Sequence, residues 1–97
     1  MKKRMNIEDV FSSKLRIKIL KILLQLGELN LSEVARRLRV NYNIVNKHLK
    51  VLEDEGIIQH KVFGRIRLYR INEYSAKAKA LQSLIETWEK SMNNKGA

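Results

Sequence analysis

The residues best suited to recognition chemistry share one stripe of a predicted helix: Asn43, Asn46, Lys47 and Lys50. Their spacing of three and four residues places them on one helical face. An asparagine amide donates and accepts hydrogen bonds together on an adenine edge, and a lysine reaches guanine acceptors or a phosphate. The opposite stripe of this segment is expected to be buried and comprises Ile44, Val45, His48, Leu49 and Leu52. The pattern predicts a helix whose polar face can read a DNA groove.

A second basic group lies on a predicted hairpin. Its strands, Ile57–Phe63 and Ile66–Ile71, are rich in β-branched and aromatic residues, and Gly64-Arg65 fits a two-residue turn with glycine first. From residue 57 to residue 71 the sequence has four cations and no acid. We expect Arg65 and Arg67, near the hairpin tip, to contact phosphates or to enter the minor groove, whose narrow form attracts arginine.

Three helices must position the polar stripe. Apolar residues recur at helical spacing in 13–26, 32–38 and 42–55, and residues 29–31 form a short extended link. The expected N-caps and C-terminal stops are Ser12 or Ser13, Ser32, Asn41, Gly27 and Gly56. Two helices joined by about three residues, the second with an amide-and-lysine face, are typical of a helix-turn-helix.

The ends of these helices carry further candidates. Arg36, with Arg37 and Arg39, is expected to contact phosphate, because the first helix of a helix-turn-helix crosses the DNA backbone. Tyr42, in the first turn of the next helix, either packs on a sugar or a thymine methyl or makes a capping contact with the preceding helix. The acids Glu53-Asp54-Glu55 lie at the far end of that helix, where we expect a solvated terminus.

A last helix is predicted from Glu73 to Met92, after Asn72 as its cap. Apolar residues along it alternate spacings of four and three, which is typical of a heptad seam, and Leu84 widens that face. The seam comprises Tyr74, Ala78, Leu81, Ile85, Trp88 and Met92. We predict that a second copy covers the face, while the alternative is that the helix folds back onto the helix at 13–26. The predicted dimer contacts are Leu81, Leu84, Ile85, Trp88 and Met92.

The charge balance favours a polyanionic partner. The 97 residues include 20 Lys plus Arg against 10 Asp plus Glu, a formal net charge of +10. This excess predicts attraction to nucleic acid first and to an anionic membrane surface second. The most hydrophobic stretch, 15–26, carries charges and is too short to span a bilayer. We therefore expect a cytoplasmic, nucleoid-associated protein that binds double-stranded DNA and not a membrane.

The sequence has few of the residues and motifs that catalysis or metal binding requires. Cysteine is absent, which excludes disulfides, thiolate metal sites and thiol catalysis, and the only histidines are His48 and His60. The sequence has neither an H-E-x-x-H motif nor a phosphate-cradling glycine loop. The consecutive carboxylates at 53–55 diverge on a helix and cannot work as a catalytic pair. We expect no enzyme, no cofactor and no metal.

The length predicts a single domain over residues 1–97. Residues 13–71 are expected to form its core, residues 72–92 a C-terminal dimerisation helix, and residues 93–97 a frayed tail. Residues 1–4 are a candidate basic arm that touches DNA. The expected fold class is α+β, mainly α.

The segments Ser13–Leu38 and Asn41–Ile58 resemble the ArsR-type winged helix-turn-helix repressors of bacteria and archaea. The run HLKVLEDEG at His48–Gly56 is similar to that family's end of the recognition helix, and FGRIRLYRI at Phe63–Ile71 is similar to its wing. MarR-like and other winged-helix regulators share this skeleton. Metal-sensing members carry cysteine where this chain has Leu31–Val34, or His and Asp pairs on the last helix, which here has no histidine.

The resemblance implies a homodimer that binds a near-palindromic operator and represses transcription. It implies recognition positions at Tyr42, Asn43, Asn46 and Lys47, with Lys50 toward phosphate. The wing positions are then Arg65 and Arg67. Two other functions remain open: non-specific coating of DNA or RNA by a chromatin-type protein, and a winged-helix module for protein interaction.

Overall fold

The computed structural model describes residues 5–94 and has the element order of a winged helix. Its helices are α1 (Ile7–Phe11), α2 (Lys14–Leu26), α3 (Leu31–Leu38), α4 (Tyr42–Asp54) and α5 (Ala76–Asn94). Its strands are β1 (Leu29–Asn30), β2 (Ile58–Phe63) and β3 (Ile66–Ile71), which form an antiparallel sheet in the order β1-β3-β2. The predicted fold class is confirmed. The candidate basic arm at residues 1–4 lies outside the described residues.

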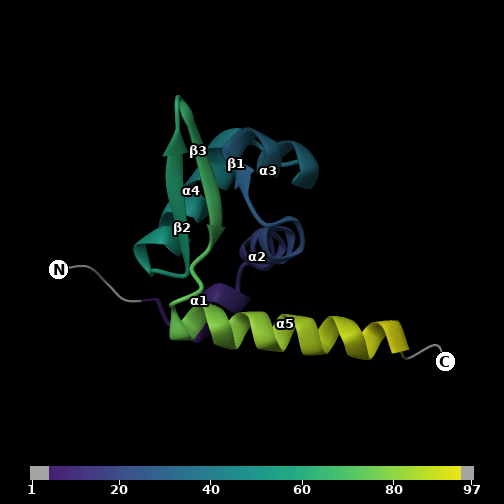
Figure 1. The fold of residues 1–97 in the computed structure, drawn as a ribbon. Coiled ribbons are helices and arrows are strands. Elements are labelled where there is room, and N and C mark those ends of the chain that lie inside the picture. The colour runs from purple at the N-terminus through teal and green to yellow at the C-terminus, as the bar shows by residue number, and fades with distance from the viewer. Residues whose placement is uncertain (1–4, 95–97) are drawn as a thin grey trace.

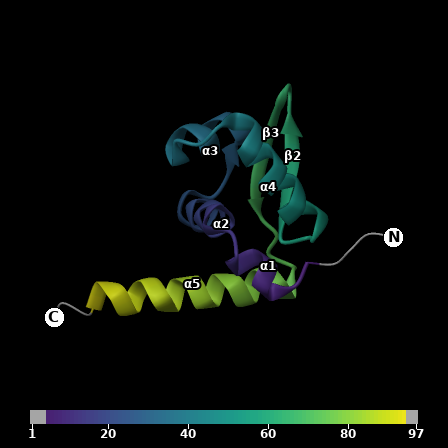
Figure 2. The same cartoon turned by 180° about the vertical axis from the view of Figure 1, so that it is seen from behind.

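The body of the molecule lies between a hairpin and the C-terminal helix. The β2–β3 hairpin, hereafter the wing, rises beside α4 at one end, while α5 runs along the opposite end near α1 and α2 (Figure 1). The reverse view shows the same separation, with the C-terminal part of α5 extending past the body (Figure 2). The wing tip and α5 are therefore far from each other.

Helix α3 begins one residue earlier than predicted, and its N-cap is a different residue. Asn30 is the N-cap: its Oδ1 accepts a hydrogen bond from the Glu33 N–H at 2.8 Å, and Glu33 Oε1 accepts one from the Asn30 N–H at 3.0 Å. This reciprocal pair is a capping box. The prediction of Ser32 as the cap is wrong, because β1 holds Asn30 in the extended backbone that a cap requires.

The start of α5 also lies later than predicted. Ser75 Oγ accepts a hydrogen bond from the Ala78 N–H at 3.1 Å and so caps the helix. Asn72 instead forms a turn, in which its Oδ1 accepts from the Tyr74 N–H at 3.1 Å and its amide donates to the Gly56 oxygen at 2.9 Å. At its other end α5 continues to Asn94, two residues into the segment expected to be frayed, while residues 95–97 lie outside the described residues.

One apolar core joins the helices to the sheet. The buried stripe of α4 consists of Val45, Leu49 and Leu52, each 0% exposed, as predicted. The prediction is wrong for Ile44, whose side chain is 46% exposed. Successive residues of an α-helix are rotated by about 100°, and this rotation takes Ile44 off the stripe to a partly exposed flank of α4.

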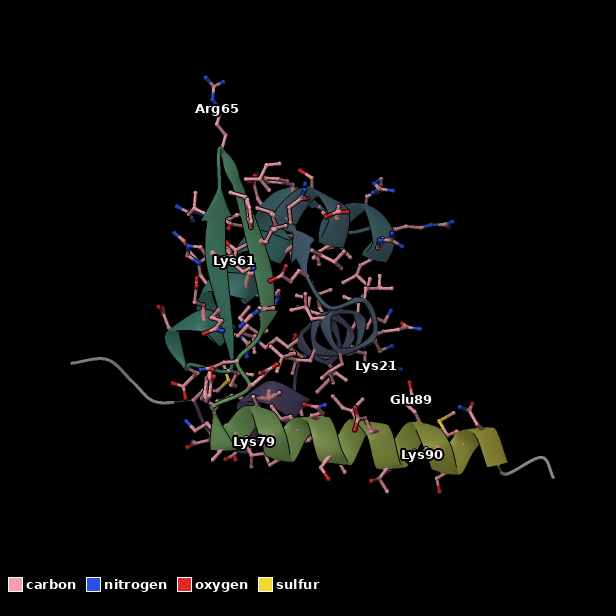
Figure 3. All side chains as sticks on the ribbon, viewed as in Figure 1. Lys21, Lys61, Arg65, Lys79, Glu89 and Lys90 are labelled. Carbon is pink, nitrogen blue, oxygen red and sulfur yellow. The ribbon has the colours of Figure 1, made fainter. Side chains whose placement is uncertain are left out.

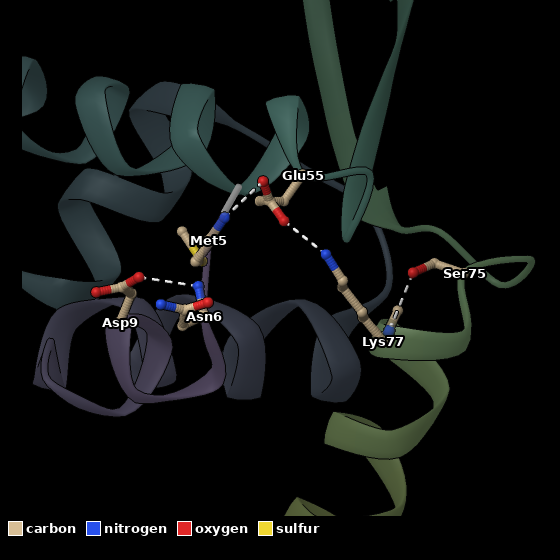
Figure 4. A network of polar contacts seen from close by, with 7 residues as sticks. Met5, Asn6, Asp9, Glu55, Ser75 and Lys77 are labelled. Carbon is tan, nitrogen blue, oxygen red and sulfur yellow. Dashed lines mark hydrogen bonds and ion pairs between the residues drawn. The ribbon is translucent and has the colours of Figure 1, made fainter. Parts of the chain in front are cut away.

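The acids at the end of α4 are structural and not simply solvated, contrary to the prediction. Glu55 Oε2 accepts a hydrogen bond from the Met5 N–H at 2.9 Å, and Glu55 Oε1 accepts one from Lys77 Nζ at 2.6 Å (Figure 4). Glu53 contacts the His60 ring on β2. Glu55 therefore ties the end of α4 both to the N-terminal segment and to α5.

A short helix that the sequence analysis did not predict, α1, precedes the winged-helix core. The Asp9 carboxylate accepts a hydrogen bond from the Asn6 N–H at 2.8 Å, and Val10 is buried. Over residues 5–94, no helix combines the length and the apolar character needed to cross a bilayer.

Candidate nucleic-acid interface

A sharp link aims α4 outward from the body. Arg39, at the end of α3, has a left-handed backbone with φ of +56°. The Val40 N–H donates to the Ala35 oxygen at 3.1 Å, which closes the end of α3. Asn41 Oδ1 then accepts from the Asn43 N–H at 2.8 Å, as predicted for the cap of α4. The link leaves the first turn of α4 at the surface.

The polar stripe of α4 is accessible. Asn43, Lys47 and Lys50 are exposed, and Asn46 is half-buried. Tyr42 is 52% exposed, so its ring is not buried against α3. The α4 candidates therefore project from the body instead of packing inside it.

The wing carries Arg65 in its turn and Arg67 on β3. Gly64 has a φ of +59°, which a two-residue turn with glycine first requires, and Arg65 stands at the tip (Figure 3). The strand register pairs Val62 with Arg67, and His60 with the buried Tyr69. Since successive residues of a strand alternate faces, Arg67 lies on the inner face of the wing that also packs on the core.

Four predicted DNA-contacting residues surround one polar hollow of about 370 Å³. Tyr42 and Asn46 line it from α4, and Arg65 and Arg67 line it from the wing. Asn30 and Ser32, at the start of α3, contribute to its floor. Asn43, Lys47 and Lys50 lie on the exposed stripe outside the hollow, and Arg36 is exposed in the last turn of α3.

Within residues 5–94, ion pairs involve two of the hairpin cations and not the other two. Glu28 Oε2 lies 3.2 Å from Lys61 Nζ and 3.5 Å from an Arg70 Nη, so one acid serves two of the four hairpin cations. Arg65 and Arg67 make no ion pair with any residue of the range 5–94. Their charge is therefore available to an anionic partner.

A histidine braces α4 from behind. His48 Nδ1 accepts a 3.1 Å hydrogen bond from Arg16 Nε on α2, and Arg16 also donates to the main-chain oxygen of Asp9 at 2.8 Å. Burial lowers the pKa of His48, and the positive charges of Arg16 and Lys47 lower this pKa further. The neutral ring therefore links α4 to α2 and α1, and His48 is half-buried on the stripe that the sequence predicts to be buried.

The C-terminal helix offers an apolar groove at the other end of the molecule. The groove, of about 390 Å³, lies between α5 and the α1–α2 region. Its apolar lining residues are Phe11, Ile17, Leu84, Ile85, Trp88 and Met92. Lys21 Nζ and Glu89 Oε1, 2.8 Å apart, flank it (Figure 3).

The predicted seam is divided by the structure. Leu81 is only 7% exposed and belongs to the core of its own chain, and Tyr74 precedes the helix. Leu84 is 44% exposed, Trp88 65% and Met92 59%. The first turns of α5 therefore pack in the core of their own chain. Exposed apolar side chains that a second copy can cover lie on the later turns.

Comparison with known proteins agrees with this geometry. The sequence model of the family described as "Bacterial regulatory protein, arsR family" matches residues 13–60, which run from the cap of α2 through the helix-turn-helix into β2. The chain belongs to the ArsR family. No curated protein sequence matches it.

Solved structures share the fold of this ArsR-family chain. HlyU from Vibrio cholerae superposes with a TM-score of 0.72 at 23% identity, covering 84% of this chain and 86% of its own. The transcriptional repressor BigR from Xylella fastidiosa has a TM-score of 0.74 at 19% identity, covering 87% and 81%.

A third similar structure is the homodimeric winged helix-turn-helix DNA-binding domain Mb0332 from Mycobacterium bovis, a possible ArsR-family transcriptional regulator. Its TM-score is 0.70 at 19% identity, and the match covers 94% of this chain and 92% of that domain. The match reaches over nearly the whole ArsR-family chain, so the likeness of fold is not confined to the helix-turn-helix.

Several residues that shape these surfaces escaped sequence reasoning. Arg16 donates a hydrogen bond to His48, Glu28 forms ion pairs with two hairpin cations, and Phe11 and Ile17 line the groove beside α5. Their spacing carries no signal, because each acts on a residue that is distant in sequence. Over the described range, no group of three or more His, Cys, Asp or Glu side chains gathers in a metal-binding arrangement.

Proposed function

We propose that this ArsR-family protein is a dimeric, sequence-specific transcriptional repressor that reads double-stranded DNA. The observation that carries the proposal is the hollow where α4 and the wing converge: it brings amide, phenol and guanidinium groups to one accessible surface. In this pose α4 enters the major groove and leads with its N-terminal half, as recognition helices do. The proposal needs neither metal nor cofactor.

Each candidate has a distinct role in this proposal. Asn43, Asn46 and Lys47 meet base edges in the major groove, since amides pair with adenine and lysine with guanine. Lys50 and Arg36 contact the phosphates on either side. Tyr42 packs on a sugar or a thymine methyl. The wing then lies over the adjacent backbone, where Arg65 and Arg67 reach phosphates or the minor groove.

The chain acts as a single winged-helix unit in this proposal, with α5 as its dimerisation element. A second copy covers the apolar groove of α5 through Leu84, Ile85, Trp88 and Met92. Leu81 supports the helix from within its own chain. A two-fold dimer presents two α4 helices to half-sites about 34–36 Å apart. Repression is then steric, and the protein works in the cytoplasm on the nucleoid.

Selection of bound sequences from a random duplex pool tests the proposal. We expect a near-palindrome, bound at least about 10³-fold more tightly than random duplex at fixed salt. Asn46→Ala should relax the preference at one base position, at a cost of about 1–3 kcal/mol. Lys79→Ala, an exposed lysine on α5 at the end of the molecule opposite the wing tip, is the control and should bind as the wild type does (Figure 3).

The selection also separates the remaining alternatives. A pool that shows no enrichment, with equal binding of all duplexes or of RNA, would point to a non-specific coating protein. Absence of binding to any nucleic acid at low salt would favour a protein-interaction module instead.

A further inference from the structure

The wing tip carries several apolar side chains that are not buried in the core. The register pairs Phe63 with Ile66 on the last rung before the turn, so their side chains share one face of the hairpin. Phe63 is 62% exposed and Ile66 is 48% exposed. Val62, on the opposite face, is 64% exposed. Three large apolar side chains therefore surround the Gly64-Arg65 turn.

The aromatic ring at the tip has a cationic neighbour. Lys61 Nζ lies 5.4 Å from the centroid of the Phe63 ring, within the range of a cation–π interaction. The same Nζ is 3.2 Å from Glu28 Oε2, beside β1. Lys61 therefore contacts both Glu28 and the Phe63 ring on the outer face of the wing.

Charge identifies the partner that such a tip fits. Adjacent exposed apolar side chains are a feature of binding surfaces, and here Phe63 and Ile66 stand among basic groups with no acid between residues 57 and 71. Arg65 projects from the same tip (Figure 3). Ile66 also lines the polar hollow with Asn46 and Arg67, so one member of the apolar pair borders the proposed DNA-reading surface. A strongly anionic groove meets both requirements, whereas a second copy of this basic chain does not.

We propose that Phe63, backed by Ile66, is a wedge that enters partly between two base pairs from the minor groove and bends the duplex. This inference rests on the proposed function, because it requires α4 to be seated in the neighbouring major groove. A narrow minor groove attracts the Arg65 guanidinium, and apolar wedges of this kind unstack base steps and kink DNA. Pyrimidine–purine steps unstack most easily, so the wedge adds sequence preference at a step that α4 does not touch.

The test compares the wild type with Phe63→Ala on the duplex recovered by selection. 2-Aminopurine replaces the flanking adenines one at a time, since its emission rises when the base is unstacked, and dyes at the duplex ends report bending. We expect the wild type to raise the emission at one flanking step and to bring the dyes closer. Phe63→Ala should abolish both signals and weaken binding about tenfold, a loss of ~1.4 kcal/mol.

Two further variants distinguish the effect of the wedge from the effect of lost charge and from a general effect of removing an aromatic ring. Phe63→Ala should leave the salt dependence of binding unchanged, whereas Arg65→Ala should reduce the slope by about 0.9 for each lost phosphate contact. Tyr74→Ala removes an aromatic ring that is 85% exposed outside the wing, and it should change neither emission nor bending. Circular dichroism confirms that each variant is folded.

The outcomes distinguish the two proposals. If the wild type binds no duplex, the proposed function fails and the wedge with it. If it binds tightly but the emission stays flat, or Phe63→Ala binds and bends as the wild type does, the wedge alone is overturned. The wedge is also overturned if Phe63→Ala changes only self-association of the free protein or its binding to anionic vesicles.

Discussion

Replacing Trp88 with alanine should separate the proposed dimer into monomers. Trp88 is 65% exposed and lines the apolar groove together with Leu84 and Met92, while the rest of α5 anchors it to the body. A two-fold interface uses the same patch on both copies, so a single substitution removes two rings from it. The side chain makes no contribution to the core, and the fold of the monomer should survive.

The expected effect follows from the exposed area. An aromatic side chain presents roughly 200 Å², so the exposed fraction of Trp88 corresponds to about 130 Å² on each copy. At about 25 cal/mol per Å², covering it contributes ~3 kcal/mol per ring. With partial burial of both rings, the dissociation constant of the dimer should rise by about 10²- to 10⁴-fold.

Sedimentation velocity over a dilution series measures this constant directly. Tyr74→Ala is the matched control, because Tyr74 is 85% exposed but lies before α5 and outside the groove. In the wild type, dilution should also shift the Trp88 fluorescence emission to the red, because dissociation of the dimer exposes the ring to water. A wild type that sediments as a monomer at all concentrations, or a Trp88→Ala variant as dimeric as the control, would refute the reasoning.

Three further predictions concern stability. The free energy of unfolding should fall as the pH drops below about 6.5, because the unfolded chain takes up a proton that the lowered pKa of His48 resists in the fold. His48→Gln should flatten that part of the profile in denaturant titrations, and parallel profiles would contradict the assignment. Asn30→Ala should cost about 0.5–2 kcal/mol through loss of the capping box, whereas Ser32→Ala should cost little; the reverse order in urea unfolding would refute the cap. Arg39→Gly should raise the free energy of unfolding by about 1 kcal/mol by relieving a left-handed backbone, and an unchanged melting temperature would speak against it.

Much of the helix-turn-helix could be predicted from the sequence because its signals are local. Apolar periodicity located α4 to within one residue at its end, and Asn41 was identified correctly as its cap. The prediction of the N-cap was wrong for α3 and α5, where more than one nearby residue has a side chain that can act as a cap. Whether Asn30 or Ser32 caps α3 depends on the pairing of β1 with β3, and Asn72 is held by the Gly56 oxygen instead of starting α5.

The candidate site could be predicted only as separate parts. The sequence identified Tyr42 and Asn46 on one element and Arg65 and Arg67 on another, but their convergence on one hollow depends on how the wing packs beside α4. The seam of α5 shows the same limit. A heptad pattern gives the apolar face but not its partner, and the fold assigns Leu81 to the core while it leaves Trp88 open.

The sequence by itself determined the order of the elements, the large positive charge and the polar stripe of α4, because each depends on residue type and on spacing along the chain. Only the tertiary structure decided which cations are neutralised, which apolar residues remain uncovered and which side chains meet. Glu28, which precedes β1, pairs with Lys61 on β2 and Arg70 on β3, and the hairpin register sets Phe63 beside Ile66 at an exposed tip. Such contacts join residues far apart in the chain, and they are fixed by packing and register, which no local pattern encodes.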